Sequence, residues 1–485
     1  MSIRWLRPLV LAMTLSLTAC GGGGGGTGND VASPQAASVS LLITDAPVGR
    51  WDQALATITS VKLLGDDGQV VLFEGSKTLD LLKLGNFSEL FASSDNIPPG
   101  HYSKIRLQLS DLVLRDLDDQ GALIEEQHPQ IVGNGKIDLN PRGAFDLASG
   151  DILFVELDFD MQKSLKITGT GNGKLIVRPV IFVNIRSNPR PDDRLTRIHG
   201  RITAIDADNG SFGLCQTRFV SGSENHSGEM DDGDDDNPRH CLTVATNTDT
   251  GIFGSTGEPR DFASLVTGEE ATVIGHLQPA ATGPNDADDD DGDAAELQPL
   301  VLDAVVVEEG PLHTFRLVRG MVSSPVDAAS DRFDLTLAAG QGITTDGPLP
   351  VQLYDKSHIL SHRGQELLRA DIKAGRGAAV DGVLAVGAED VLRAALVILR
   401  DESPSDEAAF QGTIQTVTPL IATVEGGDRC LDAGSADIFL VDDSDGFSSR
   451  RGDQHDLAPG QSVSIFGTEG MGGCIVADTI IVEAD

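Results

Sequence analysis

Three aspartates are the carboxylates best placed to do chemistry. Asp45, Asp158 and Asp160 each stand at or near the end of an apolar run. If they converge, they could hold a hard cation or act as a paired general acid and base. The structural alternative is that Asp45 caps the turn at Ala46-Pro47, while the other two face solvent by strand alternation. Arg106, inside an apolar run, is more typical of a paired structural arginine than of a ligand contact.

Two dense acidic runs suggest a second chemistry, weak calcium binding. The loops around Gly292 and Gly446 both fail as EF-hands. With Gly292 at the glycine position, Ala287 and Gln298 occupy positions that need acids, and with Gly446 there, Val441 and Gly452 occupy them. Loose calcium binding and a merely solvated loop therefore both stay open. The candidate ligands are Asp231, Asp232, Asp234, Asp235, Asp236, Asp288 and Asp290.

The first of five cysteines closes a targeting signal. Arg4 and Arg7 precede a short apolar run that ends at Leu17-Thr18-Ala19-Cys20. The run is too short to span a bilayer, so residues 1–20 are predicted to be a secretory signal peptide. Its end resembles the lipobox of bacterial lipoproteins, which implies lipidation of Cys20. Residues 21–37, which begin with six glycines, are predicted to form a flexible tether.

The other four cysteines predict two disulfides, because their number is even and the chain carries an export signal. Three connectivities are possible for Cys215, Cys241, Cys430 and Cys474. Pairing nearest neighbours would keep each bridge within one domain. A zinc site is the competing interpretation, but no Cys-x-x-Cys spacing accompanies these residues.

Composition limits the classes of partner. The chain has 485 residues and a formal charge of -38, from 74 acids and 36 bases. Its length predicts several domains, and its charge argues against nucleic acid or anionic lipid as a partner. No apolar run after Cys20 approaches the ~20 residues of a membrane span, so we expect the remainder to be soluble. The sequence contains no nucleophile elbow, phosphate loop or dinucleotide fingerprint. We therefore expect that the protein is not an enzyme and that it binds no cofactor other than calcium.

Residues 38–187 have the pattern of a β-sandwich. Residues 56–63 alternate at period two, and an apolar run resumes at residues 70–73 after the turn Gly65-Asp66-Asp67-Gly68. This pattern predicts a β-hairpin. Further short apolar strands follow, at the spacing expected of a sandwich.

An internal repeat predicts three small barrels. The repeats cover residues 197–309, 315–401 and 408–485, and the first contains both acidic runs as insertions. In each repeat two glycines seven positions apart enclose an alternating strand, and a second apolar strand follows. Three such coincidences predict homologous β-barrels of OB-like size. The glycine pairs are Gly268/Gly275, Gly375/Gly382 and Gly460/Gly467.

The N-terminal segment resembles the bacterial lipoprotein family called domain of unknown function 4382. The resemblance rests on Val39 to Pro47, on Gly100 to Leu107, and on Asp158-Phe159-Asp160 with Ser164. The three repeats are similar to another family, domain of unknown function 5666, through their glycine spacing. Both resemblances imply an exported bacterial protein, and neither implies a reaction.

These observations predict an all-β, lipid-anchored protein of the cell envelope, attached to the outer membrane. We expect a non-enzymatic binding or spacing role, with a glycan or an envelope protein as ligand. Exposure of Trp51 or Tyr102 on a flat face would favour this role. The alternative is an envelope hydrolase, or a hydrolase accessory, that uses Asp45, Asp158 and Asp160.

Overall fold

The computed structural model is nearly all β, as predicted. All described residues belong to one compact unit, Gln35–Asp485. Among them no helix is long and apolar enough to cross a membrane. The described residues are 36–46, 51–85, 87–118, 121–141, 144–166, 175–177, 179–187, 195–216, 241–279, 300–362, 364–387, 390–400, 408–424, 427–442, 447–470 and 473–483.

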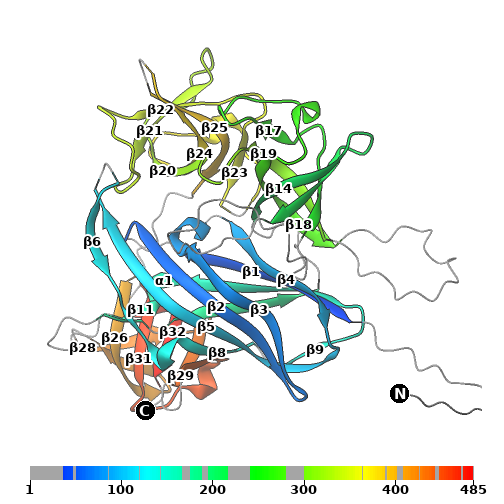
Figure 1. The fold of residues 1–485 in the computed structure, drawn as a ribbon. Coiled ribbons are helices and arrows are strands. Elements are labelled where there is room, and N and C mark those ends of the chain that lie inside the picture. Colours follow the sequence, from blue (N-terminus) through cyan, green and yellow to red (C-terminus); the bar gives the residue numbers. More distant parts are fainter. Residues whose placement is uncertain are drawn as a thin grey trace, which may run out of the picture. The chain divides into compact units, whose positions relative to one another are not determined.

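The N-terminal domain is a sandwich of two sheets (Figure 1). The first sheet has the order β13-β10-β1-β4 and comprises β1 (Ala37–Ala46), β4 (Ser88–Ile97), β10 (Ile152–Asp160) and β13 (Ile181–Arg186). The second has the order β3-β2-β5-β8 and comprises β2 (Gln53–Gly65), β3 (Gly68–Asp80), β5 (Gly100–Leu117) and β8 (Lys136–Asn140). Apolar side chains from both sheets form one core, which includes Leu41, Ile58, Leu107 and Leu157.

Short elements complete this domain. Strands β6 (Leu123–Gln127) and β9 (Phe145–Leu147) pair with β5. A small sheet holds β7 (Gln130–Ile131), β11 (Leu165–Lys166) and β12 (Ile176–Val177). The helical turns are η1 (Leu81–Gly85), η2 (Val132–Gly135) and α1 (Met161–Ser164).

The predicted hairpin is confirmed as β2 and β3. Buried and partly exposed residues alternate along most of β2, because one face of the strand packs on the core. The turn closes with Gly65 paired to Gly68, and Gly68 has φ 120°, a conformation that favours glycine.

Each repeat forms a closed ring of five strands, with one further strand attached in the first two repeats and two in the third, which confirms the predicted barrels. The first barrel closes as β14-β15-β16-β19-β18 and comprises β14 (Thr196–Asp206), β15 (Ser211–Gln216), β16 (Cys241–Ala245), β17 (Gly251–Phe253), η3 (Phe262–Ser264), β18 (Glu270–Pro279) and β19 (Leu300–Glu309). The second closes as β20-β21-β22-β25-β24 and comprises β20 (Arg316–Val322), β21 (Arg332–Leu337), β22 (Leu349–Gln352), β23 (His358–Ser361), η4 (Arg369–Asp371), β24 (Gly377–Ala385) and β25 (Val391–Leu399). The third closes as β26-β27-β28-β32-β31 and comprises β26 (Ala408–Val417), β27 (Leu420–Val424), β28 (Gly427–Asp432), β29 (Asp437–Asp442), β30 (Phe447–Gly452), η5 (Gln454–Asp456), β31 (Ser462–Glu469) and β32 (Ile475–Glu483).

Backbone geometry explains the repeated glycine pairs. The first glycine of each pair turns into a strand at positive φ: 95° at Gly268, 87° at Gly375 and 92° at Gly460. The second lies at a β-bulge, where a Cβ atom would approach a carbonyl oxygen of the next strand to 2.1–2.3 Å. Only glycine satisfies both positions without moving the backbone. The three bulge glycines are Gly275, Gly382 and Gly467.

Two barrels extend the sheets of the sandwich. Strand β14 of the first barrel pairs in parallel with β4, so that Arg197 lies opposite Glu89. Strand β30 of the third barrel pairs in parallel with β8, and Arg450 lies opposite Asn140. The first and third barrels therefore join opposite sheets of the same domain.

Candidate ligand-binding face

The register of β1 and β10 shows how the three candidate aspartates are arranged. In this parallel pair Asp158 lies beside Thr44 and Asp160 beside Ala46, whereas residue 45 is paired with Phe159. Because neighbouring residues of a strand alternate between faces, the register puts residue 45 out of the row that holds Asp158 and Asp160. The backbone thus groups two of the three aspartates.

Asp160 has a structural role. It is 5% exposed, and its Oδ2 lies 2.9 Å from Lys163 Nζ while its Oδ1 accepts the backbone N–H of Lys163 at 3.0 Å. The hydroxyl of Ser164 donates to the Asp160 carbonyl at 2.6 Å and accepts the N–H of Val180 at 2.7 Å. These bonds fix the turn α1 after β10, which gives a physical reason for the spacing of Asp160 and Ser164.

A more promising site is the outer face of the second sheet, which we call the basic face: Thr57–Leu64 of β2, Lys104–Ser110 of β5 and Lys136–Asn140 of β8. The alternate residues of these strands are in the core; Leu63, Ile105 and Leu107 are fully buried. The opposite face therefore presents the polar positions. It carries Lys62, Lys104, Arg106 and Lys136 against one acid, Asp138, in a chain whose acids outnumber its bases twofold.

Strand register arranges these side chains in rows. Lys62, Arg106 and Asp138 lie side by side across β2, β5 and β8. Ser60, Gln108 and Lys136 form the next row. Adjacent strands are about 4.8 Å apart and alternate residues about 6.8 Å, so the cations cover a flat grid.

Arg106 and Asp138 form the centre of the face. The guanidinium donates two hydrogen bonds, Nε to Oδ1 at 2.6 Å and Nη2 to Oδ2 at 2.7 Å. This hydrogen bond raises the pKa of Arg106. Burial alone would raise the pKa of Asp138, but Arg106, followed by Lys136 and Lys104, holds it below its ordinary value. The pair is neutral overall, as expected of a structural arginine.

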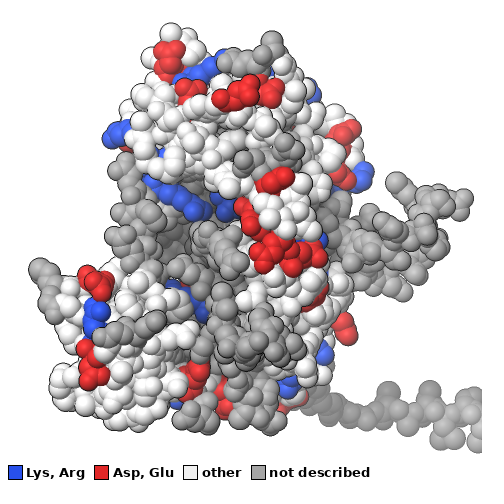
Figure 2. Space-filling view, turned by 90° about the vertical axis from the view of Figure 1, so that its left-hand side faces the viewer, with Lys and Arg blue, Asp and Glu red and all other residues white. Residues whose placement is uncertain are grey.

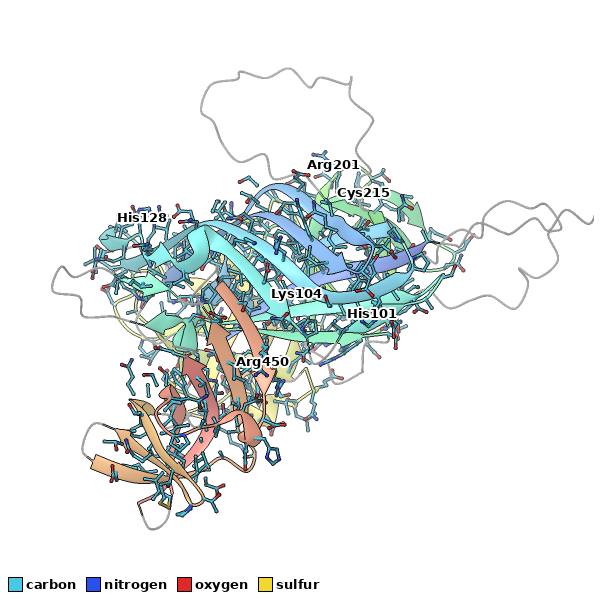
Figure 3. All side chains as sticks on the ribbon, turned by 90° about the horizontal axis from the view of Figure 1, so that it is seen from below. His101, Lys104, His128, Arg201, Cys215 and Arg450 are labelled. Carbon is cyan, nitrogen blue, oxygen red and sulfur yellow. A yellow bond between two sulfur atoms is a disulfide. The ribbon has the colours of Figure 1, made fainter. Side chains whose placement is uncertain are left out.

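The three lysines around this pair are available to a ligand. Lys62, Lys104 and Lys136 have no hydrogen-bond or ion-pair partner among the described residues. Lys136 is exposed, and Lys62 and Lys104 are half-buried. Figure 3 labels both Lys104 and Arg450. The guanidinium of Arg450 is already paired with Asp456 at 2.8 Å, so Arg450 adds no unpaired charge. The unbalanced charge of the face therefore comes from the three lysines.

Acidic groups border the basic face. Glu74 of β3 lies opposite Ser60. His101 pairs with Asp146 at 2.8 Å, and this hydrogen bond raises the pKa of His101. On the side of the molecule drawn in Figure 2, acidic and basic side chains occupy small groups, some of them side by side, with much uncharged surface around them. A cationic group can thus act locally, because charges beyond about 8 Å are screened at physiological ionic strength.

The aromatic residues whose exposure would have favoured a binding role are buried, so they do not support that role. Trp51 is 7% exposed and Tyr102 is 5% exposed. The Tyr102 hydroxyl donates to the carbonyl of Pro98 at 2.7 Å and stabilises the strand turn. Hydrophobic partners, not ligand stacking, account for both positions.

The four cysteines Cys215, Cys241, Cys430 and Cys474 form the two nearest-neighbour disulfides. Cys215 is bonded to Cys241 and Cys430 to Cys474, which confirms the predicted bridges and selects one of three connectivities. Cys215 and Cys241 are directly opposite in the β15–β16 pair. Cys20 and the calcium candidates Asp231 to Asp236, Asp288 and Asp290 lie outside the described residues. Among the described residues no group of three or more His, Cys, Asp or Glu could hold a metal ion.

Sequence reasoning missed the three lysines. The usable signal was alternation: Lys104 and Arg106 occupy polar positions between buried Ile105 and Leu107. Polar positions on neighbouring strands share a face only if the strands pair in the right register, which the sequence does not specify.

Comparison with known families supports the assignment of the N-terminal domain. Residues 36–179 match the family described as Domain of unknown function (DUF4382). No curated protein matches the chain.

Proposed function

We propose that this chain is a lipid-anchored protein of the bacterial cell envelope that binds an acidic glycan on its basic face without catalysing a reaction. The observation that carries the proposal is the set of three unpartnered lysines around the satisfied Arg106–Asp138 pair. Lysines without intramolecular partners can gain ion pairs on binding and lose none.

The polar neighbours of the lysines favour a glycan over other polyanions. Ser60 and Gln108 share the row of Lys136, and Thr57 and Ser110 continue the same face. Hydroxyl and amide groups can hydrogen-bond sugar hydroxyls, while the lysines pair with uronate carboxylates. Lysines beside hydroxyl and amide groups can therefore hold a glycan through charge and hydrogen bonds.

The proposed address rests on the N-terminal sequence. The lipobox-like ending at Cys20 supports lipidation, and Gly21, where an inner-membrane retention signal would have aspartate, supports the outer membrane. Two disulfides support an oxidising compartment. As part of this proposal, we assign the three barrels to the family called domain of unknown function 5666, on the basis of their glycine spacing. For the hydrolase alternative, the register of β1 and β10 groups Asp158 with Asp160 but not with residue 45.

The binding test uses the full chain with Cys20→Ser and the probe polygalacturonate, with dextran as the neutral control. Lys62→Gln/Lys104→Gln/Lys136→Gln should weaken binding at least about tenfold and flatten its salt dependence, because three charge contacts are lost. A matched variant, Lys83→Gln/Arg201→Gln/Lys373→Gln, removes the same charge elsewhere and should bind as the parent chain does.

Equal affinity of the two triple variants would overturn the proposed face. Equal binding of polyglutamate or of phosphatidylglycerol vesicles, with the same lysine dependence, would overturn the glycan as ligand class. The Cys20→Ser change also tests the anchor, since it should release the protein from washed membranes. Membrane retention of this variant after a high-salt wash would contradict lipid anchoring.

A further inference from the structure

Three charged side chains are enclosed where the first and second barrels meet. Arg197 of β14 lies 3.6 Å from Glu308 of β19 and 3.5 Å from Asp381 of β24. The side chains of both acids are 0% exposed, and that of Arg197 is 19% exposed. Apolar residues of both barrels surround them, among them Val306, Ile398 and Ala395.

The group is incompletely satisfied. None of the four carboxylate oxygens of Glu308 and Asp381 has a hydrogen-bond partner among the described residues. Its ion-pair distances exceed the ~2.8 Å of a charge-assisted hydrogen bond. One guanidinium therefore faces two buried carboxylates, so neutrality requires one proton.

The internal repeat shows that the fold does not need these charges. Asp381 directly precedes a bulge glycine, where the other barrels have Ile274 and Phe466. The residue opposite is Arg197 in the first barrel but Leu317 and Ala409 in the others. Glu308 lies where the other barrels have Ile398 and Ile481. All three charges thus occupy positions that are apolar in both sister barrels.

We propose that docking between the first and second barrels is pH-sensitive: a single proton and Arg197 together balance Glu308 and Asp381, and loss of that proton to solvent loosens the interface. With the proton on Glu308, the buried group is neutral. Once the proton leaves, a net negative charge is enclosed by apolar side chains. Separating the barrels then hydrates both carboxylates.

The direction of the pH effect follows from Glu308. Burial, and then the charge of Asp381, raise the pKa of Glu308 well above 4.5 against the attraction of Arg197. A group whose pKa is raised in the docked state stabilises docking below its undocked pKa, and this stability is lost as the pH rises through the docked pKa. Docking is therefore tightest on the acidic side and weakens toward alkaline pH.

Other charged groups face the site from neighbouring elements. Lys83 on η1 faces Asp381, and Glu89 on β4 and His199 on β14 face Arg197; Glu270 on β18 and His313 in turn lie near His199. Glu89 is itself paired with Lys77 at 3.1 Å. Burial lowers the pKa of His199 below 6.5, which destabilises the docked state only in acid. The lowered pKa of His199 puts its titration on the acidic side, whereas burial raises the pKa of both Glu308 and Asp381 and puts their titration on the alkaline side.

The test measures exposure of the interface in the full chain with Cys20→Ser. Ala395 is fully buried in the interface cluster, so Ala395→Cys supplies a thiol that alkylating reagents reach only when the barrels separate. The labelling rate is divided by that of the same chain carrying Glu308→Gln at the same pH, which cancels the intrinsic reactivity of the thiol. This ratio should rise with pH from pH 7, by up to about tenfold per pH unit while the pH is below the docked pKa of Glu308, and should level off once the pH exceeds it.

Two further variants decide between a switch and a merely structural group. The triple variant Arg197→Leu/Glu308→Ile/Asp381→Ile carries the residues of the sister barrels and should label slowly at every pH relative to the parent. Glu258→Gln removes an exposed ion pair with Arg393 across the same interface and should leave the pH profile unchanged. A flat ratio, or a triple variant with the parent's profile, overturns the proposal. If Ala395→Cys disturbs packing, the deciding measurement is the melting temperature as a function of pH. It should fall at alkaline pH in the parent chain and stay constant in Glu308→Gln.

Discussion

The second and third barrels use the same face of the same fold in opposite chemical ways. In the third barrel Phe466 and Ile481 pack into the core of the sandwich domain, and Phe439 contacts Phe182 edge to face at 4.7 Å. In the second barrel the position of Phe466 is Asp381, which meets Arg197 and Glu308 of the first barrel. The order of the five ring strands and the bulge glycine are shared, so the same position of the same ring serves two different docking chemistries.

This contrast separates folding from docking in the sequence. Inward residues of β24 and β31, such as Val380 and Ile465, are buried in their own barrel cores. The chemical type of the outward residues matches the surface that covers them: Asp381 lies against Arg197 of the first barrel, and Phe466 packs into the apolar core of the sandwich domain. Each barrel can thus keep its core while its outer residues determine where it attaches.

The largest effect should come from exchanging the chemistry at this shared position. Phe466→Ala removes a buried ring and should cost about 3–5 kcal/mol of unfolding free energy. Asp381→Ile leaves Arg197 and Glu308 as a balanced pair and should be neutral or stabilising by about 1–4 kcal/mol. Urea unfolding of the full chain at pH 7 measures both. A cost for Asp381→Ile that equals that of Phe466→Ala would show that the charges stabilise the interface.

Local patterns predicted each barrel, but not what covers it. The hairpin of β2 and β3, the glycine pairs and the disulfide partners all follow from residues close in sequence or from pairing within one domain. Arg197 and Asp381 meet only because two barrels dock, and no periodicity encodes that contact. The sequence likewise did not decide whether Trp51 and Tyr102 are exposed, and the structure places both in the core of the sandwich domain.

The second-largest effect should come from reducing the disulfides, because only two of the three barrels contain one. Cys215–Cys241 closes a separation of 26 residues in the first barrel and Cys430–Cys474 one of 44 in the third. Chain-entropy arithmetic gives about 3.5 and 4 kcal/mol for these loops. The second barrel contains no cysteine. Calorimetry after reduction should therefore show lower melting temperatures for the first and third barrels and an unchanged melting temperature for the second.

The control for this experiment is the pair of variants Cys215→Ser/Cys241→Ser and Cys430→Ser/Cys474→Ser, each of which should lower one transition. A drop in the transition of the second barrel on reduction would mean that its stability depends on its neighbours rather than on its own core.

The smallest effect should come from the exposed ion pairs at the two docking interfaces. Glu258 pairs with Arg393 between the first and second barrels at 3.0 Å, and Asp478 of the third barrel lies 3.4 Å from Lys163 of the sandwich. Glu258 is 57% and Asp478 70% exposed, so water competes for both carboxylates. Glu258→Gln and Asp478→Asn should each cost about 0–1 kcal/mol in urea unfolding, and 1 M NaCl should remove the difference from the parent. Lys163 keeps Asp160 as a partner at 2.9 Å, so Asp478→Asn leaves no buried charge unpaired. A loss of more than about 2 kcal/mol of unfolding free energy in either variant would show that the exposed ion pairs contribute substantially to docking. It would contradict the view that the buried outward residues, which are charged at one interface and apolar at the other, determine how the barrels attach.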